Sequence, residues 1–130
     1  MMSGITLNPR DIIQIVIDFG DGHETKYRPA LIISNSFVNQ NADSIIVLPI
    51  TRNPQSDPFM LKINSSDFES GSLPFESQVI LDNIFTREKS EYRKHFGRVT
   101  KDFFQRVMDK VTYDVLANSR SSANVITPET

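Results

Sequence analysis

The chain has 130 residues and a formal net charge of −2, and this length fits one domain that buries about two thirds of the surface its unfolded chain exposes. The weak negative charge argues against a protein that coats nucleic acid through bulk charge, and the absence of cysteine excludes disulfides, thiolate metal sites and a cysteine nucleophile. No apolar run approaches the roughly 20 residues that a membrane-spanning helix needs, so we expect a soluble, cytoplasmic protein.

The first half of the chain predicts three strands. Residues 10–19 (RDIIQIVIDF) are rich in β-branched side chains and predict the first strand. A glycine-containing connection at 20–27 leads to RPALIIS (28–34), a second strand with its proline at the entry, where a missing N–H does least harm. After a loop or single helical turn at 36–44, SIIVLPIT (44–51) is continuously apolar and predicts a third strand covered on both faces.

The second half continues with short strands and ends in a helix. Turn residues at 52–58 precede a short strand at 59–63, an irregular excursion at 64–77, a fifth strand at 78–86 and a short strand at 97–99. Thr100 stands where a helix N-cap is expected. The following helix carries one apolar stripe, which we expect to pack on the core. The stripe consists of Phe104, Val107, Met108, Val111 and Val115.

Five or six short strands and one C-terminal helix predict a mostly β or α+β fold, a small, twisted, antiparallel, barrel-like sheet closed by the helix. We expect an N-terminal extension at 1–9, one domain at 10–118 and a polar, flexible C-terminal tail at 119–130.

Basic residues gather late in the chain. Eight of the 14 Lys and Arg residues fall between Arg87 and Lys110, against four acids. The basic members are Arg87, Lys89, Arg93, Lys94, Arg98, Lys101, Arg106 and Lys110. For this basic sector we expect a solvated face around a surface helix, since charge runs most often have that origin.

Several motifs in order carry a family resemblance. RDIIQIVIDF, GHE, YRPALIISN, IIVLPIT and SQVILDNIFT, followed by GRVTKDFFQRVMDKV, resemble the PemK/MazF family of bacterial toxins over residues 10–116. That family's pattern is a strand opening with Gly-Asp, a Gly-His-Glu loop, an Arg-Pro-led strand, a strand ending Pro-Ile-Thr and a later Asp-Gln-Ile-Arg-Thr strand. The resemblance implies that residues 10–118 form a toxin domain with an SH3-like barrel and that the protein is a homodimer. It also implies a metal-independent, cofactor-free endoribonuclease that acts on single-stranded RNA and is restrained by a cognate antitoxin.

The resemblance also assigns the site. The active-site arginine of the family falls on Arg28, its strand-end threonine on Thr51, its loop histidine on His23 and its acidic residue on Asp82.

Four positions depart from the family pattern. Asn83 replaces a glutamine, Phe85 replaces an arginine, and Arg10 replaces the opening glycine. Ile80 stands where one branch of the family has an arginine. Two arginines of the family pattern, at the positions of Ile80 and Phe85, are therefore missing. Two functions stay open: an RNA-cleaving toxin, or a toxin-fold protein that acts by binding RNA, an antitoxin or DNA gyrase.

Metal-independent RNA cleavage needs a base for the 2′-OH, a clamp for the phosphoryl oxygens and an acid for the leaving 5′-oxygen. The planar, permanently charged fork of Arg28 suits the clamp, and the Thr51 hydroxyl can donate to the same oxygens. His23 titrates near neutrality and can move the proton, with Glu24 and Asp82 as alternative bases.

The residues expected to bind RNA are Lys26, Tyr27, Arg52 and Phe59, as cations for phosphate or rings for base stacking. On the resemblance, the basic sector gains a second interpretation, as a surface for the RNA or the antitoxin.

Ordinary structural roles remain open for the same residues. Arg28 can pair with Glu24, Thr51 can satisfy a turn, and His23 can be an exposed bystander. Tyr27 and Phe59 can belong to the core. We expect His95 on the surface without a functional role.

Overall fold

The computed structural model describes residues 6–18, 26–52 and 56–117. The strands are β1 (Asp11–Ile17), β2 (Lys26–Ile32), β3 (Ser44–Thr51), β4 (Met60–Ile63), β5 (Phe68–Gly71), β6 (Ser77–Ile80), β7 (Phe85–Glu88) and β8 (Lys94–Val99). The helices are α1 (Ser36–Asn41) and α2 (Lys101–Lys110), which continues into a π-helical segment, η3 (Val111–Leu116). Short 3-10 turns are η1 (Ser65–Asp67) and η2 (Lys89–Glu91).

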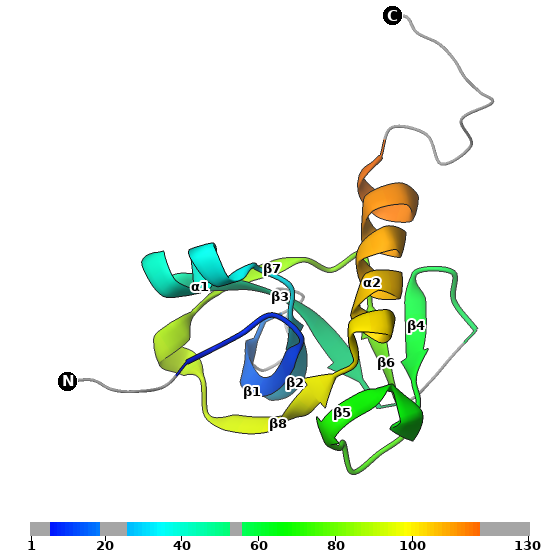
Figure 1. Ribbon diagram of the computed structural model, residues 1–130, viewed down its shortest axis with the longest axis horizontal. Coiled ribbons are helices and arrows are strands. Elements are labelled where there is room, and N and C mark those ends of the chain that lie inside the picture. Colours follow the sequence, from blue (N-terminus) through cyan, green and yellow to red (C-terminus); the bar gives the residue numbers. More distant parts are fainter. Residues whose placement is uncertain (1–5, 19–25, 53–55, 118–130) are drawn as a thin grey trace, which may run out of the picture.

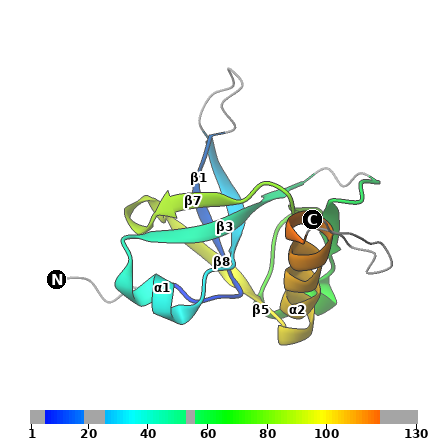
Figure 2. The same ribbon diagram turned by 90° about the horizontal axis from the view of Figure 1, so that it is seen from above.

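The strands form one antiparallel, strongly curled sheet. Neighbours follow the order β4-β6-β3-β2-β1-β8-β5, and β7 also pairs with β3. Figures 1 and 2 show the sheet curling into a half-barrel, with α1 and α2 at opposite ends. The prediction of a small, twisted antiparallel sheet with one C-terminal helix is confirmed, and the structure adds the short helix α1 at the position left open between loop and helical turn.

The described residues contain eight strands, more than the five or six expected from the sequence. The predicted fifth strand at 78–86 is wrong as one element, because a turn at Leu81 and Asp82 divides it into β6 and β7. β6 pairs with the end of β3 through Ile50 and Thr51, whereas β7 pairs with its start, residues 44–47. The long strand β3 therefore pairs with two short strands, β6 and β7, along different parts of its length.

The excursion at 64–77 also contains a strand, β5, which pairs with β8. Two glycines permit the close approach of these strands. A Cβ on Gly97 would lie 2.4 Å from the Ser70 carbonyl oxygen, and Gly71 has a φ of +74°, which favours glycine. β8 is longer than the predicted 97–99 and begins at Lys94.

Apolar side chains form a core on each face of the sheet. The outer core lies under α2 and includes Leu48 and Ile50 of β3. Its buried residues are Ile12, Leu31, Leu48, Ile50, Ile63, Val79, Leu81, Val99, Phe103, Val107 and Val111. The inner core, on the other face, includes Ile45 and Val47 of β3. Its buried residues are Leu7, Ile13, Ile15, Ile17, Ala30, Ile32, Ile45 and Val47. The prediction that β3 is covered on both faces is confirmed.

The helix α2 begins and packs largely as its sequence indicates. The Thr100 hydroxyl accepts a hydrogen bond from the Phe103 N–H at 3.1 Å, which confirms the N-cap. Val107 and Val111 of the predicted stripe are buried, and its other members pack partly buried against the outer core. Phe103, absent from the predicted stripe, is fully buried.

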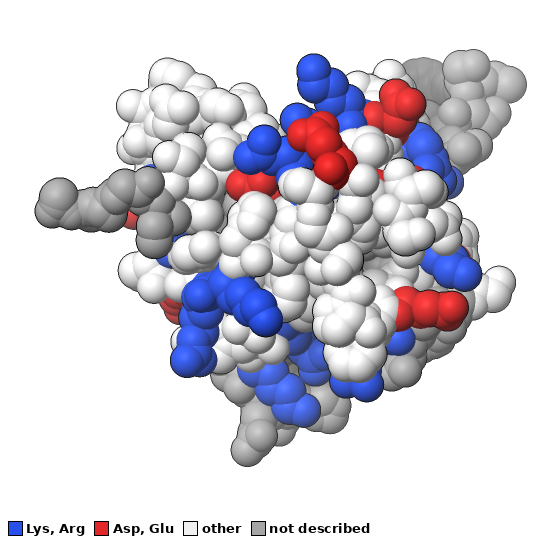
Figure 3. Space-filling view, turned by 60° about the horizontal axis from the view of Figure 1, so that its bottom comes forward, with Lys and Arg blue, Asp and Glu red and all other residues white. Residues whose placement is uncertain are grey.

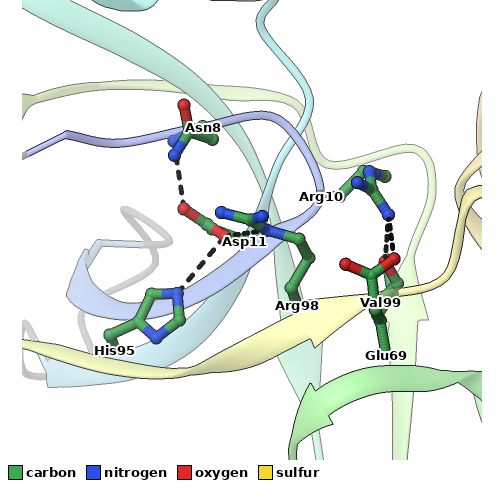
Figure 4. A network of polar contacts seen from close by, with 7 residues as sticks. All are labelled: Asn8, Arg10, Asp11, Glu69, His95, Arg98 and Val99. Atoms are coloured by element: carbon green, nitrogen blue, oxygen red, sulfur yellow. Dashed lines mark hydrogen bonds and ion pairs between the residues drawn. The ribbon is translucent and has the colours of Figure 1, made fainter.

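A polar network ties the start of β1 to β8 (Figure 4). The buried Asp11 carboxylate accepts from Arg98 Nε at 2.9 Å and from the Asn8 backbone N–H at 3.0 Å, and His95 Nε2 lies 3.2 Å from it. His95 is exposed as expected, with this contact added. The network links strands from opposite ends of the chain.

The backbone of Arg10 has a positive φ, a conformation that residues other than glycine rarely adopt. Its φ is +78°, in the left-handed region, and the opening glycine of the family pattern would suit this conformation. The Arg10 guanidinium donates to the Val99 carbonyl at 2.9 Å and to Glu69 at 3.0 Å. The hydrogen bond from Arg10, and then its charge, hold the pKa of the Glu69 carboxyl below its ordinary value. This pair therefore stabilises the fold above the unfolded-state pKa, and its contribution is lost as the pH falls through the lowered folded-state value.

We expect Asp11→Asn to lower the free energy of unfolding by about 1.5–3 kcal/mol, because it weakens charge-assisted hydrogen bonds to a buried carboxylate. Urea denaturation measures the loss. The matched change Glu69→Gln breaks an ion pair exposed to water and should cost less. A larger loss for Glu69→Gln than for Asp11→Asn would contradict this account.

Candidate active site

A cavity of about 390 Å³ opens beside the ends of β2 and β3. Its walls come from β1, β2, β3, β8, the segment between β5 and β6, and the start of β6. The lining residues are Gln14, Tyr27, Arg28, Pro29, Ile50, Thr51, Arg52, Leu73, Pro74, Phe75, Ser77, Lys94 and Phe96.

The cavity is positively charged. Arg28, Arg52 and Lys94 line it, and none of its lining residues in the described chain is acidic. Figure 3, which brings the lower side of Figure 1 forward, shows Lys and Arg side chains across the lower half of that face, and further Lys and Arg side chains mixed with Asp and Glu at its top. Three cations around one opening attract an anion of phosphate type.

Neutral donors and aromatic rings complete the lining. Thr51 and Ser77 offer hydroxyl groups, and Tyr27, Phe75 and Phe96 offer rings. The guanidinium of Arg52 lies 3.7 Å from the centre of the Phe75 ring, and that of Arg93 lies 4.2 Å from the Tyr27 ring. The first stack holds Arg52 and Phe75 together in the cavity lining, and the second supports the Tyr27 ring through Arg93, which is not a lining residue.

Strand pairing explains how distant residues meet here. Arg28 of β2 lies opposite Ile15 of β1, and Thr51 at the end of β3 lies opposite Gln78 of β6. The Nε atom of Arg28 is buried, so the protein encloses its side chain as far as the guanidinium group. The fully buried Ala30, Leu31 and Ile32 anchor the same strand.

A β-bulge in β8 shapes the part of the cavity wall that this strand contributes. Ile12 pairs with Gly97 and Ile13 with His95, so Phe96 is the extra residue between them. Lys94 and Phe96 line the cavity, while His95 contacts Asp11. Bulges commonly redirect side chains beside functional sites.

Four residues selected from the sequence meet at the cavity: Tyr27, Arg28, Thr51 and Arg52. Tyr27 is 42% exposed, which favours the rim position over a core role. Lys26, also selected, is exposed at the start of β2, next to Tyr27, and does not line the cavity.

Two other selected residues lie elsewhere. Asp82 is exposed in the turn after β6, and Phe59, 40% exposed, precedes β4. The Leu81 N–H donates to the Phe59 carbonyl at 2.8 Å, which places these residues together, but neither lines the cavity. His23 and Glu24 lie outside the described residues.

The basic sector divides. Arg87 pairs with Glu91 at 2.8 Å, Arg98 pairs with the buried Asp11 at 2.9 Å, and Lys94 reaches the cavity. Sequence reasoning missed Lys94, Phe96, Phe75 and Gln14 as lining residues. The alternation of Lys94 and Phe96 was an available indication of a strand with one face on the site.

The arrangement can bind a phosphate group and donate hydrogen bonds to it. Across 6–18, 26–52 and 56–117, no three His, Asp or Glu residues are grouped so that they could hold a metal ion. Over the same residues, no helix has the length and apolar character to cross a membrane.

A sequence comparison identifies the family of this chain, and solved structures share its fold. A sequence profile for PemK-like, MazF-like toxins of type II toxin-antitoxin systems matches residues 8–113. No curated protein sequence matches the chain. A mycobacterial endoribonuclease solved in complex with its cognate antitoxin has 24% sequence identity and a TM-score of 0.59, over 82% of this chain and 87% of its own.

Two further solved structures share the fold. The Mycobacterium tuberculosis toxin MazF-mt6 has 19% identity and a TM-score of 0.63, over 82% of this chain and 98% of its own. MazF from Deinococcus radiodurans has 17% identity and a TM-score of 0.69, over 83% of this chain and 94% of its own.

Proposed function

Because the chain belongs to the PemK-like, MazF-like toxins of type II toxin-antitoxin systems, we propose that it is an endoribonuclease that cuts single-stranded RNA and is neutralised by a cognate antitoxin. The observation that carries this proposal is the cavity that Arg28, Arg52 and Lys94 line together with Thr51, without an acidic lining residue in the described chain. The similarity to an endoribonuclease solved with its antitoxin supports it. We further propose that it acts in the cytoplasm as a homodimer.

The proposed reaction is attack of a 2′-OH on the adjacent phosphorus. It breaks the bond to the 5′-oxygen and leaves a cyclic phosphate on one fragment and a 5′-OH on the other. Arg28 clamps the phosphoryl oxygens, whose negative charge increases in the transition state. Thr51 donates a hydrogen bond to the same group.

Proton transfer needs a group outside this pair. In the described chain, the cavity lining contains no histidine and no carboxylate. We therefore propose His23 as the group that moves the proton, with Glu24 as the alternative base. Asp82 is the weaker candidate, because it is exposed in a turn that does not line the cavity.

Two departures from the family pattern lie away from the cavity. Phe85 packs partly buried against the inner core, and Ile80 is half-buried in β6 opposite Met60. Neither side chain lines the cavity. Their replacement of arginine leaves the cluster of Arg28, Arg52 and Lys94 intact, which favours the cleaving toxin over a protein that only binds.

The direct test is incubation of the purified protein, with EDTA present, with a long single-stranded RNA, followed by mapping of the new 5′ ends. Discrete cuts at one short motif, with 5′-OH ends that a polynucleotide kinase labels without phosphatase treatment, are expected. Intact RNA, from folded protein free of antitoxin, would contradict the proposal and favour action by binding RNA, an antitoxin or DNA gyrase.

We expect Thr51→Ala to lower the single-turnover cleavage rate about 10²–10³-fold, because it removes one donor to the developing charge. Affinity for an RNA with a 2′-deoxy group at the cut site should change little, since Arg28 and Lys94 remain. Thr86→Ala, at an exposed strand threonine of β7, is the matched control and should cleave normally. Equal rates for Thr51→Ala and Thr86→Ala would remove Thr51 from the mechanism.

A further inference from the structure

A second cavity, of about 310 Å³, adjoins the first. The two share Leu73, Pro74 and Phe75 of the segment between β5 and β6, and Ser77 at the start of β6, so this stretch is a common wall. The full lining of the second cavity is Ile63, Asn64, Ser65, Phe68, Gly71, Ser72, Leu73, Pro74, Phe75, Glu76 and Ser77.

The chemistry of the second cavity is opposite to that of the first. None of its lining residues in the described chain is Lys or Arg, and Glu76 contributes a carboxylate. Ile63, Phe68 and Leu73 provide apolar surface. A phosphate would meet no cation and one negative charge there, whereas a flat, uncharged ring with an N–H donor fits both the walls and the carboxylate. The volume lies at the lower end of the roughly 300–1,000 Å³ typical of ligand clefts.

Phe75 stands between the two cavities. Its ring is 49% exposed, belongs to both linings and carries Arg52 at 3.7 Å from its centre. Single-stranded nucleic acid is held by this combination of a cation for phosphate and an exposed ring for a base. An RNA chain with its phosphate at Arg52 and Arg28 therefore has a stacking surface next to it, and beside that a pocket with no Lys or Arg among its described lining residues.

Local contacts hold the common wall in place. The Ser77 hydroxyl donates to the Phe75 carbonyl at 2.9 Å, and the Ser72 N–H donates to the Phe96 carbonyl at 3.2 Å. The first contact fixes Phe75 relative to β6, and the second ties the start of the segment to β8. Such support is what a discriminating pocket requires.

We propose that the second cavity binds an unpaired RNA base next to the scissile phosphate, and that Glu76 selects a base with an exocyclic amino group by accepting its hydrogen bond. A carboxylate accepts from the amino group of cytosine in this way. Uracil presents a carbonyl at the same position and is disfavoured by repulsion. This inference rests on the proposed function, since it assigns base selection to the same RNA substrate.

Binding measurements separate the two proposals. Fluorescent 2′-deoxy-blocked tetranucleotides that vary in all base combinations at the two central positions report base preference without cleavage. We expect the wild-type protein to favour an amino-bearing base over uracil about ten-fold at one position, and Glu76→Gln to abolish that preference, because glutamine both donates and accepts. Glu88→Gln, at an exposed carboxylate of β7, is the matched control and should keep the wild-type profile.

Each outcome has one meaning. Loss of the preference in Glu76→Gln alone supports the base pocket, whether or not the wild-type protein also cuts RNA. Identical profiles for wild type, Glu76→Gln and Glu88→Gln would overturn it. Binding without cleavage by the wild type would overturn only the endoribonuclease proposal, and no binding of any oligonucleotide would overturn both.

Discussion

Replacement of Arg28 by alanine is expected to lower the rate of RNA cleavage about 10³-fold. Removal of one neutral hydrogen-bond donor from a preorganised site lowers the rate about 10²–10³-fold. A charged donor makes a stronger hydrogen bond, so we expect the loss for Arg28→Ala to lie at the upper end of this range. The side chain lines the cavity, its Nε is buried, and the strand below it is anchored in both cores. Single-turnover kinetics on an RNA with a mapped cut site measure the loss.

Two companion variants sharpen this test. Arg28→Lys keeps the charge but loses the planar fork, so its rate should fall between those of Arg28→Ala and wild type. Arg106→Ala removes an exposed arginine of α2 that does not line the cavity, and it should cleave at the wild-type rate. Melting curves establish that each variant is folded. A folded Arg28→Ala protein that cleaves at the wild-type rate would show that this cavity is not the active site.

Local sequence features predicted much of the fold. The β-branched runs of β1, β2 and β3 and the N-cap at Thr100 depend on neighbours in the chain, and these predictions hold. The division between β6 and β7 could not be predicted in this way. It depends on pairing with two parts of β3, and the apolar residues on both sides of Asp82 continue one pattern.

The candidate site was predictable only in part, for a similar reason. Arg28 and Thr51 stand at strand ends within motifs, so a family pattern can identify them. The alternation of Lys94 and Phe96 indicates a shared strand face, but these residues reach the cavity through the pairing of β8 with β1 and the bulge at Phe96, which the local pattern does not specify. Asp82 illustrates the converse, because the family pattern assigned it to the site, whereas in the structure it lies in a turn and does not line the cavity.

The helix that covers the outer core offers the largest expected effect on stability. Phe103 is fully buried in the first turn of α2 and belongs to the outer core with Leu31 of β2 and Leu48 of β3. Phe103→Ala should lower the free energy of unfolding by about 3–5 kcal/mol, from the lost burial and the cavity left behind. That is a large share of the roughly 5–15 kcal/mol that stabilises a typical domain.

The functional consequence follows from the strands beneath the helix. Leu31 and Leu48 lie on the strands that carry Arg28 and Thr51, so loosening the outer core should reduce cleavage at temperatures where wild type is stable, with activity returning on cooling. Phe37→Ala, at a ring that is 74% exposed on α1, is the matched control and should change stability by less than about 0.5 kcal/mol. Urea denaturation compares the two variants. Equal losses would mean that packing of α2 against the sheet contributes little to the stability of the site.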